Sequence, residues 1–331
     1  MSIKILQPGL FSTVQDLGRK GYEHIGFSGA GAMDQFSFKV AQSLINNDGP
    51  AIEYTLIGPT IQFNTQNTFV ITGGSINASL NNKTISMNSV ILAEKGDILK
   101  IGAITKGARG YLTFGHSINV PSIAESYATH TRSSIGGFKG RKLLANDVIT
   151  VKINNDFKEN IGKTIHLQDD LLPENNIIHI LQGPQFEAFS EEARAKIVNH
   201  PYLDRMGYRL EGDSVAPINQ ADIISEPVAL GSVQVPNDGQ PIILLNDKQT
   251  IGGYTKIATV CKFDLPKLAQ MKPQDTIQFK WISFQEAVDK NREQMSLFNE
   301  ILKSHQKTPI FDTSSLRHTS KKLATILKGD L

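Results

Sequence analysis

Short apolar segments separated by turn residues recur along most of the chain. They are rich in Val, Ile, Leu, Phe and Thr, as at 69–72, 89–92, 97–101, 111–114, 177–181, 242–245 and 276–279. Gly, Asn and Asp mark the turns between them, for example at Asn81-Asn82, Gly96-Asp97 and Asp238-Gly239. Apolar runs at this spacing predict β-barrels or sandwiches, and not a parallel sheet with helical crossovers.

Three segments carry helix patterns. Residues 34–46 and 190–198 begin behind Asp34 and Ser190, two residue types that cap helix N-termini. A third helix begins with the capping-box spacing of Ser283 to Glu286 and runs toward 305. Its apolar stripe is predicted to pack on the body of the protein. The stripe comprises Val288, Met295, Phe298, Ile301 and Leu302.

A weak internal repeat divides the chain. Glu53 is followed by Leu56-Ile57-Gly58 and an apolar run, and Glu226 by Ala229-Leu230-Gly231 and an apolar run. Such repetition predicts two related β-rich lobes. The polar stretch 154–176 is the expected boundary. The predicted domains are a first lobe at 1–160, a second lobe at 161–283, and a C-terminal helix with a polar, partly disordered tail at 284–331.

Composition excludes several classes of protein. The 331 residues suit about two domains, and 34 Lys and Arg against 32 Asp and Glu give a net charge of +2. This near-balance argues against a nucleic-acid partner, because proteins that bind polyanions carry a strong basic excess. With Cys261 as the one cysteine, neither an intramolecular disulfide nor a cysteine-based zinc site is possible. Its apolar surroundings predict a buried core residue.

Motifs of common cofactor sites are absent from the sequence. There is no G-x-x-x-x-G-K-[ST] loop, no G-x-G-x-x-G fingerprint and no G-x-S-x-G elbow. The eight histidines lack the H-x-x-x-H spacing of a helical metal site, so no metal ligands are predicted. No lysine stands between two methionines, so biotin attachment to this chain is not expected.

No apolar run is long enough for a membrane helix, and the N-terminal residues lack the apolar stretch of a signal peptide. We therefore expect a cytoplasmic protein with no membrane partner.

Four loop segments rich in Gly and polar residues are the candidates for chemistry, at 26–34, 129–141, 201–210 and 246–256. The first runs into a helix, whose opening N–H groups bind anions. The second combines Arg132 with hydroxyls and Gly136-Gly137, which suits a carboxylate or phosphate. Each segment alone is also explained as a tight turn, and Asp204-Arg205 as a surface ion pair. Because sites concentrate on loops of a rigid scaffold, four such loops together predict a binding site.

Together these segments resemble one family, that of the 5-oxoprolinase C subunit. It is also called KipA-like or allophanate hydrolase subunit 2-like, and is labelled biotin-dependent carboxyltransferase. The resemblance covers about residues 3 to 282. It is carried by residues 6–19, 28–34, Glu53 with Gly58-Pro59, 126–140, 204–210, 225–226, 231–236, 238–241 and 247–254.

The resemblance implies a mainly β protein with two cyclophilin-like β-barrel lobes, a few short helices and a C-terminal helix. It implies two partners, a KipI-like B subunit plus a LamB/YcsF-like A subunit. With them, the protein would open the lactam 5-oxoproline to L-glutamate, through a phosphorylated lactam. ATP with Mg would be shared with the partner subunits.

Two other functions stay open within the same family. One is a carboxyltransferase subunit that moves CO2 from carboxybiotin to urea or a similar amide, with the biotin on a separate carrier. The other is a regulatory KipA-like protein that binds a KipI-like kinase inhibitor.

Opening a lactam through a phosphorylated carbonyl oxygen needs cations and N–H donors around the developing charge. Placed on the matching segments, the resemblance gives candidate cations, N–H donors and orienting carboxylates. The catalytic candidates are Asp34, Arg132, Arg205, Glu226, Asp247 and Lys256. The substrate- or phosphate-binding candidates are Ser28, Gly29, Gly136, Gly137, Gln234, Gln249, Gly252, Gly253 and Tyr254. His130, in the second loop segment, is given no catalytic role.

Overall fold

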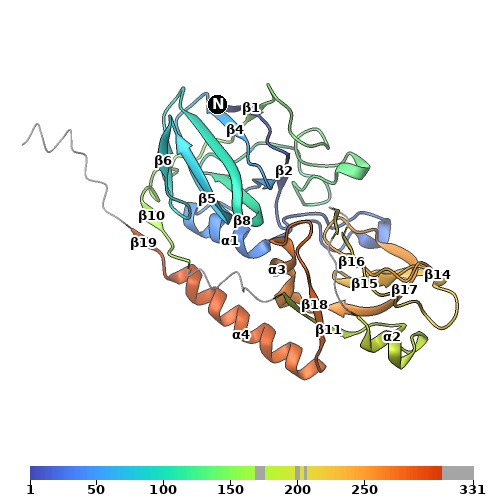
Figure 1. The fold of residues 1–331 in the computed structure, drawn as a ribbon. Coiled ribbons are helices and arrows are strands. Elements are labelled where there is room, and N and C mark those ends of the chain that lie inside the picture. The colour runs from blue at the N-terminus through green and yellow to red at the C-terminus, as the bar shows by residue number, and fades with distance from the viewer. Residues whose placement is uncertain (168–175, 198–201, 205–206, 308–331) are drawn as a thin grey trace, which may run out of the picture.

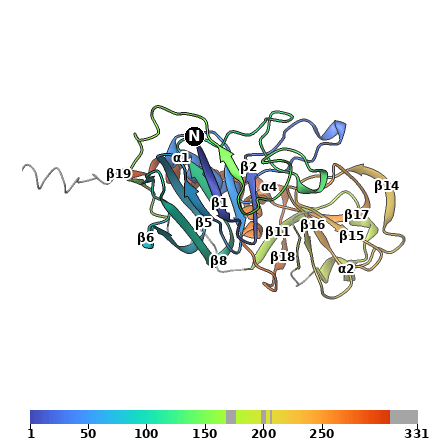
Figure 2. The same ribbon diagram turned by 90° about the horizontal axis from the view of Figure 1, so that it is seen from above.

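A computed structural model describes residues 1–167, 176–197, 202–204 and 207–307 (Figure 1). Two β-sheets lie side by side, one built from the first half of the chain and the other from the second (Figure 1). The view from above keeps the same arrangement (Figure 2). The prediction of a mainly β fold with few helices is confirmed. The predicted tail from 308 onward lies outside the described residues.

The N-terminal lobe is a nine-stranded sheet in the order β2-β3-β8-β4-β1-β9, in which β5 pairs with β6, β7 and β8. Its strands are β1 (Ser2–Gln7), β2 (Phe11–Gln15), β3 (Ala51–Thr55), β4 (Thr60–Phe63), β5 (Asn67–Leu80), β6 (Lys83–Ile85), β7 (Ile91–Ala93), β8 (Ile98–Phe114) and β9 (Val148–Thr150). The long antiparallel ladder of β5 and β8 encloses a core that includes Ile5, Phe63, Phe69 and Phe114.

The C-terminal lobe is an eight-stranded sheet in the order β12-β13-β16-β15-β17-β11-β18, with β14 paired to β17. Its strands are β11 (Ile177–Gln182), β12 (Tyr202–Asp204), β13 (Gly207–Arg209), β14 (Asp222–Pro227), β15 (Ser232–Val235), β16 (Ile242–Leu244), β17 (Ile251–Val260) and β18 (Gln278–Trp281). The pairing of β11 with β18 is parallel, whereas the other ladders of this sheet are antiparallel.

All three predicted helices form. Their bounds are α1 (Gln35–Ile45), α2 (Glu191–Ala195) and α4 (Phe284–Lys303), capped by Asp34, Ser190 and the Ser283–Glu286 capping box. A further short helix, α3 (Leu265–Ala269), follows β17 and was not predicted. Short 3-10 turns lie at η1 (Glu23–Ile25), η2 (Thr131–Ser133), η4 (Phe186–Ala188) and η5 (Lys262–Asp264).

Helix α4 joins the two lobes (Figure 1). Near its start, Ala287 packs with the buried Cys261 and Phe263 of the C-terminal lobe. Near its end, the Phe298 ring lies 4.8 Å from the ring of Phe36 on α1. Beyond it, β19 (Gln306–Lys307) pairs with β10 (Lys163–Thr164). The predicted packing of this helix is therefore confirmed.

One member of the predicted stripe was placed wrongly. Met295 is 55% exposed, whereas Phe298, Ile301 and Leu302 pack against the apolar face of α1. Cys261 is buried as predicted, and burial raises the pKa of its thiol to about 11. A thiol with such a pKa stays protonated near neutral pH, as expected of a core residue.

The predicted domain limits at 160 and 283 stay a prediction. Ile165 packs with Val40, Leu44 and Val70 of the N-terminal lobe, so the chain leaves that lobe only after this residue.

Candidate functional site

The loop from Ser28 to Asp34 lies between the two lobes. The N–H of Ala30 donates to the carbonyl oxygen of Asn246 at 2.9 Å, and Asn246 Nδ2 donates to the carbonyl oxygen of Ala32 at 2.7 Å. Gly31 has φ +91, and a side chain there would collide with the backbone at Gly18. Two of the four loop segments singled out from the sequence, 26–34 and 246–256, therefore meet at the seam between the lobes.

Arg19 is fixed beside this seam and is 3% exposed. Its Nη2 donates to the carbonyl oxygen of Ala128 at 2.6 Å, and its Nε donates to that of Ile123 at 3.2 Å. Within the described ranges, Arg19 Nη1 is buried and has no hydrogen-bond partner. A side chain at Gly136 would collide with Arg19 Nη2. The loop segment 129–141 therefore packs directly against a guanidinium that keeps one donor nitrogen unused.

Two carboxylates set the electrostatic surroundings of Arg19. Burial lowers the pKa of its guanidinium, and the charges of Asp16 and Asp247 offset part of that shift. Asp16 accepts hydrogen bonds from Ser126 Oγ at 2.7 Å and from the N–H of Tyr127 at 2.6 Å. These bonds fix the position of the loop that carries Ile123 and Ala128, whose carbonyl oxygens accept from Arg19. Asp247, a predicted site residue, is buried within electrostatic reach of Arg19.

A cavity of about 110 Å³ opens beside Arg19. It is lined by Arg19, Ile25, Gly26, Phe27, Ser28, His130, Ser133 and Ile135. His130 is 9% exposed, and its Nδ1 lies 2.9 Å from Ser133 Oγ. Its Nε2 is buried and has no hydrogen-bond partner in the part of the chain that the structure describes. The cavity thus has two unused nitrogens among its lining residues.

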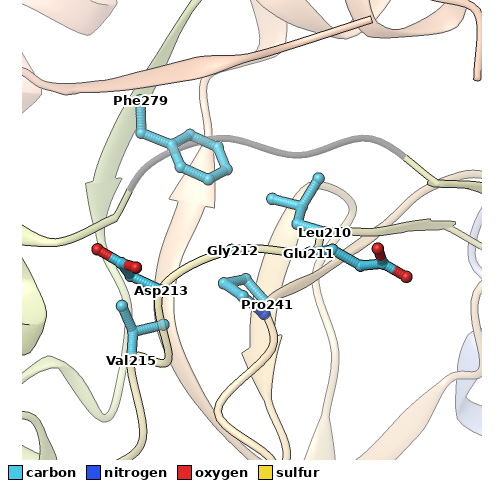
Figure 3. A pocket seen from close by; sticks show the side chains of 7 residues that line it. All are labelled: Leu210, Glu211, Gly212, Asp213, Val215, Pro241 and Phe279. Carbon is cyan, nitrogen blue, oxygen red and sulfur yellow. The ribbon is translucent and has the colours of Figure 1, made fainter. Parts of the chain in front are cut away.

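A second pocket does not have room for a ligand. It measures about 10 Å³, close to the ~10–15 Å³ that one water needs. Phe279, Leu210 and Pro241 form much of its wall, and the carboxylates of Glu211 and Asp213 point to opposite sides (Figure 3).

The C-terminal lobe holds a second polar cluster, around Lys256 on β17. Its ammonium is 1% exposed and lies 2.6 Å from Glu226 Oε1. Gln185 Nε2 donates to the same oxygen at 2.7 Å, and Gln185 Oε1 accepts from the N–H of Lys256 at 3.0 Å. The hydrogen bond from Lys256, followed by that from Gln185, holds the pKa of Glu226 below its usual range.

Gln234 extends this cluster. It is opposite Lys256 in the register of β15 and β17, and its Nε2 is buried without a partner among the described residues. A side chain at Gly252 would collide with this nitrogen. The fold therefore brings together four of the predicted site residues from three strands. They are Glu226 on β14, Gln234 on β15, and Gly252 and Lys256 on β17.

Asp34 occupies a different setting. Its Oδ1 accepts from the N–H groups of Phe36 and Ser37, and its Oδ2 accepts from Ser37 Oγ at 2.6 Å and Gln270 Nε2 at 2.7 Å. Burial raises the pKa of this carboxyl. The geometry is that of a helix cap and of a bond between the lobes, and the catalytic role of Asp34 stays a prediction.

The other predicted residues are placed less closely together. Arg132 is exposed on η2, between the cavity residues His130 and Ser133. Gln249 is exposed in the loop between β16 and β17, and Tyr254 is 39% exposed on β17 opposite Asp222. Gly29, Gly137 and Gly253 lie in the same loop or strand segments as their neighbours Ser28, Gly136 and Gly252. Arg205 lies outside the described residues.

Sequence reasoning did not select Arg19 or His130 as site residues. Arg19 ends the segment 6–19 that carries part of the family resemblance, directly after the Asp16-Leu17-Gly18 turn. His130 lies inside the loop segment 129–141 that was selected. The signal available in the sequence was an arginine that directly follows the Asp16-Leu17-Gly18 turn and ends a segment carrying the resemblance.

Neither a metal-binding cluster nor a nucleotide-sized cavity is found among the described residues. No cluster of three or more His, Cys, Asp or Glu side chains is placed to hold a metal among residues 1–167, 176–197 and 207–307. The 110 Å³ cavity is also small beside the ~300–1,000 Å³ of typical cofactor pockets.

Among residues 1–167, 176–197 and 207–307, no helix has the length and apolar character required to span a membrane.

Comparison with known proteins gives consistent similarities. The model of the family "Carboxyltransferase domain, subdomain A and B" matches residues 25–281. The 5-oxoprolinase C subunit of Escherichia coli is 33% identical over 307 residues, which cover 90% of this chain and 97% of the relative. Urea amidolyase of Saccharomyces cerevisiae is 32% identical over 311 residues, which cover 86% of this chain and 17% of the relative.

Among solved structures, the urea amidolyase of K. lactis superimposes with a TM-score of 0.79 at 27% identity. The match covers 94% of this chain and 20% of that one, so this chain spans a small part of the solved protein.

Proposed function

The chain belongs to the carboxyltransferase domain family, subdomains A and B, and from this we propose that it is the C subunit of an ATP-dependent 5-oxoprolinase complex. The complex would open the lactam of 5-oxoproline to give L-glutamate. This chain would be active only together with its partner subunits.

The observation that carries the proposal is the extent of the similarity. The chain matches 97% of the E. coli 5-oxoprolinase C subunit, whereas it matches 17% of the yeast urea amidolyase. A shared fold does not separate the two activities, because one fold serves many functions. The match over nearly the whole length of the E. coli relative favours the activity in which that relative takes part.

The role proposed for this chain is to bind and orient the substrate. A lactam is a stable amide, and opening it requires positive groups and N–H donors near the carbonyl oxygen as charge develops there. The buried ammonium of Lys256, beside Glu226, and the unused nitrogens of Arg19 and His130 are groups of this kind. ATP with its Mg would be shared with the partner subunits, which would supply the nucleotide-sized pocket that is not found among the described residues.

The partners proposed are a KipI-like B subunit plus a LamB/YcsF-like A subunit. The word "subunit" in the name of the E. coli relative supports a multi-subunit enzyme. Biotin is not expected on this chain in the proposed reaction.

The test is reconstitution of the complex. Purified chain is mixed with its A and B partners, 5-oxoproline and ATP, and glutamate is measured over time. We expect glutamate release that requires all three proteins. Omitting this chain is the control, and an unchanged rate without it would refute the proposal. So would a complete mixture that releases no glutamate although the partners are shown to be folded and to associate with the chain.

A carboxyltransferase activity on urea or a similar amide is the second candidate. The 32% identity to yeast urea amidolyase and the matching fold of the K. lactis enzyme favour it. It predicts that labelled bicarbonate is transferred to urea when a biotin carrier is added, and that avidin stops the transfer. Turnover of 5-oxoproline that avidin leaves unchanged would exclude a biotin-dependent route for that reaction.

A further inference from the structure

We propose that the cavity beside Arg19, in the N-terminal lobe, is a carboxylate-binding site built from Arg19 and His130. Resting on the proposed function, its ligand is a lactam acid, with 5-oxoproline as the substrate. Four properties of the cavity support such a ligand: its fixed guanidinium, its imidazole, the carboxylates around it and its size.

The Arg19 guanidinium is held in place before any ligand arrives. Its Nε and Nη2 donate to the carbonyl oxygens of Ile123 and Ala128, and the N–H of Arg19 donates to the carbonyl oxygen of Gly29 at 2.7 Å. Nη1 remains unused although the side chain is buried. Buried donors are nearly always paired, so an unused one beside a cavity points to a ligand oxygen. A fixed side chain also loses little freedom on binding.

His130 supplies the second donor. Its loop is closed by two backbone hydrogen bonds between His130 and Ile135, which fix the position of the ring. When Ser133 Oγ donates to Nδ1, the proton of the neutral imidazole is on Nε2, the nitrogen that lacks a partner. An anionic ligand favours this tautomer. In the proposed site, Arg19 Nη1 and His130 Nε2 would offer one donor each to the two oxygens of a carboxylate.

The surrounding carboxylates select the kind of anion. Both oxygens of Asp16 are already engaged, because Oδ1 accepts from the N–H of Gly18 and from Ser126 Oγ and Oδ2 accepts from the N–H of Tyr127. Asp247 carries a second negative charge close to Arg19. Lys248, 9% exposed, adds a positive charge on the same loop, with Glu23 near it. A negative group beside the site disfavours a bare dianion such as phosphate and favours a ligand that also offers an N–H donor, as a lactam acid does.

The size of the cavity limits its ligand to a small molecule. At about 110 Å³ it is smaller than the ~150 Å³ cavity that holds benzene, so it takes one end of a small acid, such as the carboxylate end of a lactam acid, and excludes a nucleotide. The apolar side chains of Ile25, Phe27 and Ile135 line the rest of the wall and suit the methylene groups of a lactam ring.

The experiment compares ligands and variants. The full chain is titrated calorimetrically with 5-oxoproline, with 2-pyrrolidinone, which is the same lactam without the carboxylate, and with inorganic phosphate. The variants are Arg19→Gln, His130→Phe and Lys20→Gln, where Lys20 is the exposed neighbour of Arg19 and serves as the matched loss of charge. In the reconstituted complex, kcat and KM for 5-oxoproline are measured for the same proteins.

We expect 5-oxoproline to bind at least about tenfold more tightly than 2-pyrrolidinone or phosphate. A single charge-assisted hydrogen bond to the carboxylate lowers the Kd by about tenfold. Arg19→Gln and His130→Phe should each raise the Kd and the KM about tenfold with little change in kcat, and Lys20→Gln should change neither. Because Arg19→Gln loses two structural hydrogen bonds, His130→Phe decides the result if the arginine variant does not fold.

Failure of the site and failure of the proposed function give different results. An active complex whose KM is unchanged by His130→Phe refutes the carboxylate site and leaves the function standing. Equal binding of 5-oxoproline and 2-pyrrolidinone refutes it as well. An inactive complex, with 5-oxoproline binding that is still weakened by His130→Phe, refutes the function and supports the site.

Discussion

Gln270 Nε2 lies 2.7 Å from Asp34 Oδ2, and this hydrogen bond joins the C-terminal lobe to the cap of helix α1 in the N-terminal lobe. The same amide accepts, through Oε1, from the N–H groups of Ala108 at 3.0 Å and Arg109 at 3.1 Å. One buried side chain thus pairs, across the seam, with the carboxylate that caps α1 and with two backbone N–H groups of β8.

Replacing Gln270 should weaken the whole protein. Gln270→Ala removes the partner of Asp34 Oδ2 and of two buried backbone N–H groups, and each buried polar group left unpaired costs about 1–3 kcal/mol. We expect the free energy of unfolding in urea to fall by about 2–4 kcal/mol. The control is Gln220→Ala, at an exposed position, which should change it little. Equal effects of the two changes would contradict the role given to this bond.

Gly136 should be sensitive because of what a side chain there would touch. Gly136→Ala adds a methyl group against Arg19 Nη2 and the carbonyl oxygen of Ala128, at a φ of +68. Gly96 has a φ of +96 with nothing within 4 Å, so Gly96→Ala carries the backbone strain without the collision. We expect Gly136→Ala to lower the free energy of unfolding by about 1–3 kcal/mol more than Gly96→Ala. Similar losses in urea denaturation would show that the packing against Arg19 carries no energy.

Two neighbouring members of the stripe predicted on α4, Met295 and Phe298, should behave differently. Phe298→Ala removes a ring that packs on Phe36 and on the apolar face of α1, and should cost about 1–3 kcal/mol, less than a fully buried phenylalanine. Met295→Ala, at a 55% exposed position, should stay within about 0.5 kcal/mol of the parent. Chemical denaturation of both variants measures the difference. A loss from Met295→Ala as large as that from Phe298→Ala would mean that another face of the helix is covered.

The pair of Glu226 and Lys256 should make stability depend on pH. Because Lys256 holds the pKa of Glu226 below its usual range, the pair stabilises the folded state at pH above that range. The stabilisation is lost as the pH falls through the lowered pKa of the folded state. At neutral pH, Glu226→Gln leaves a buried ammonium without its counter-charge and should cost about 1–3 kcal/mol, allowing for solvent at Glu226.

Thermal or urea unfolding between neutral and acid pH checks this behaviour. The stability difference between the parent and Glu226→Gln should close as the pH falls. Glu187→Gln is the control, since Glu187 pairs with Arg194 but is 84% exposed, and its difference should stay small throughout. A Glu226→Gln difference that is constant with pH would contradict the pairing as the source of the stabilisation.

The local pattern of the sequence was enough to predict strands and the capped starts of helices. Asp34, Ser190 and Ser283 all cap helices as expected, because a cap depends on residues within one turn. Met295 shows the limit of the same reasoning. A stripe at helical spacing gives a face, but which part of that face is covered depends on where α1 lies.

The candidate site was predicted in part for a similar reason. Glu226 comes from a segment that the resemblance marked, and Lys256 from the selected loop segment 246–256; the antiparallel pairing of β14 and β15 with β17 brings them together. Arg19 was missed because its partners, Ile123 and Ala128, are more than a hundred residues along the chain. Burial of a charged side chain by such distant carbonyls leaves no periodic trace in the sequence.

Helix α4 also governs the order in which the protein can be completed. A ribosome releases the N-terminal lobe first, when Phe36 on α1 still lacks Phe298 and the N–H of Ala30 still lacks Asn246. The nascent chain therefore carries an uncovered apolar helix face and an open seam until residues near 302 have emerged. Such intermediates are prone to aggregate and are typical clients of chaperones. The apolar face of α1 is therefore covered only when α4, the last described helix, has been synthesised and has packed on it.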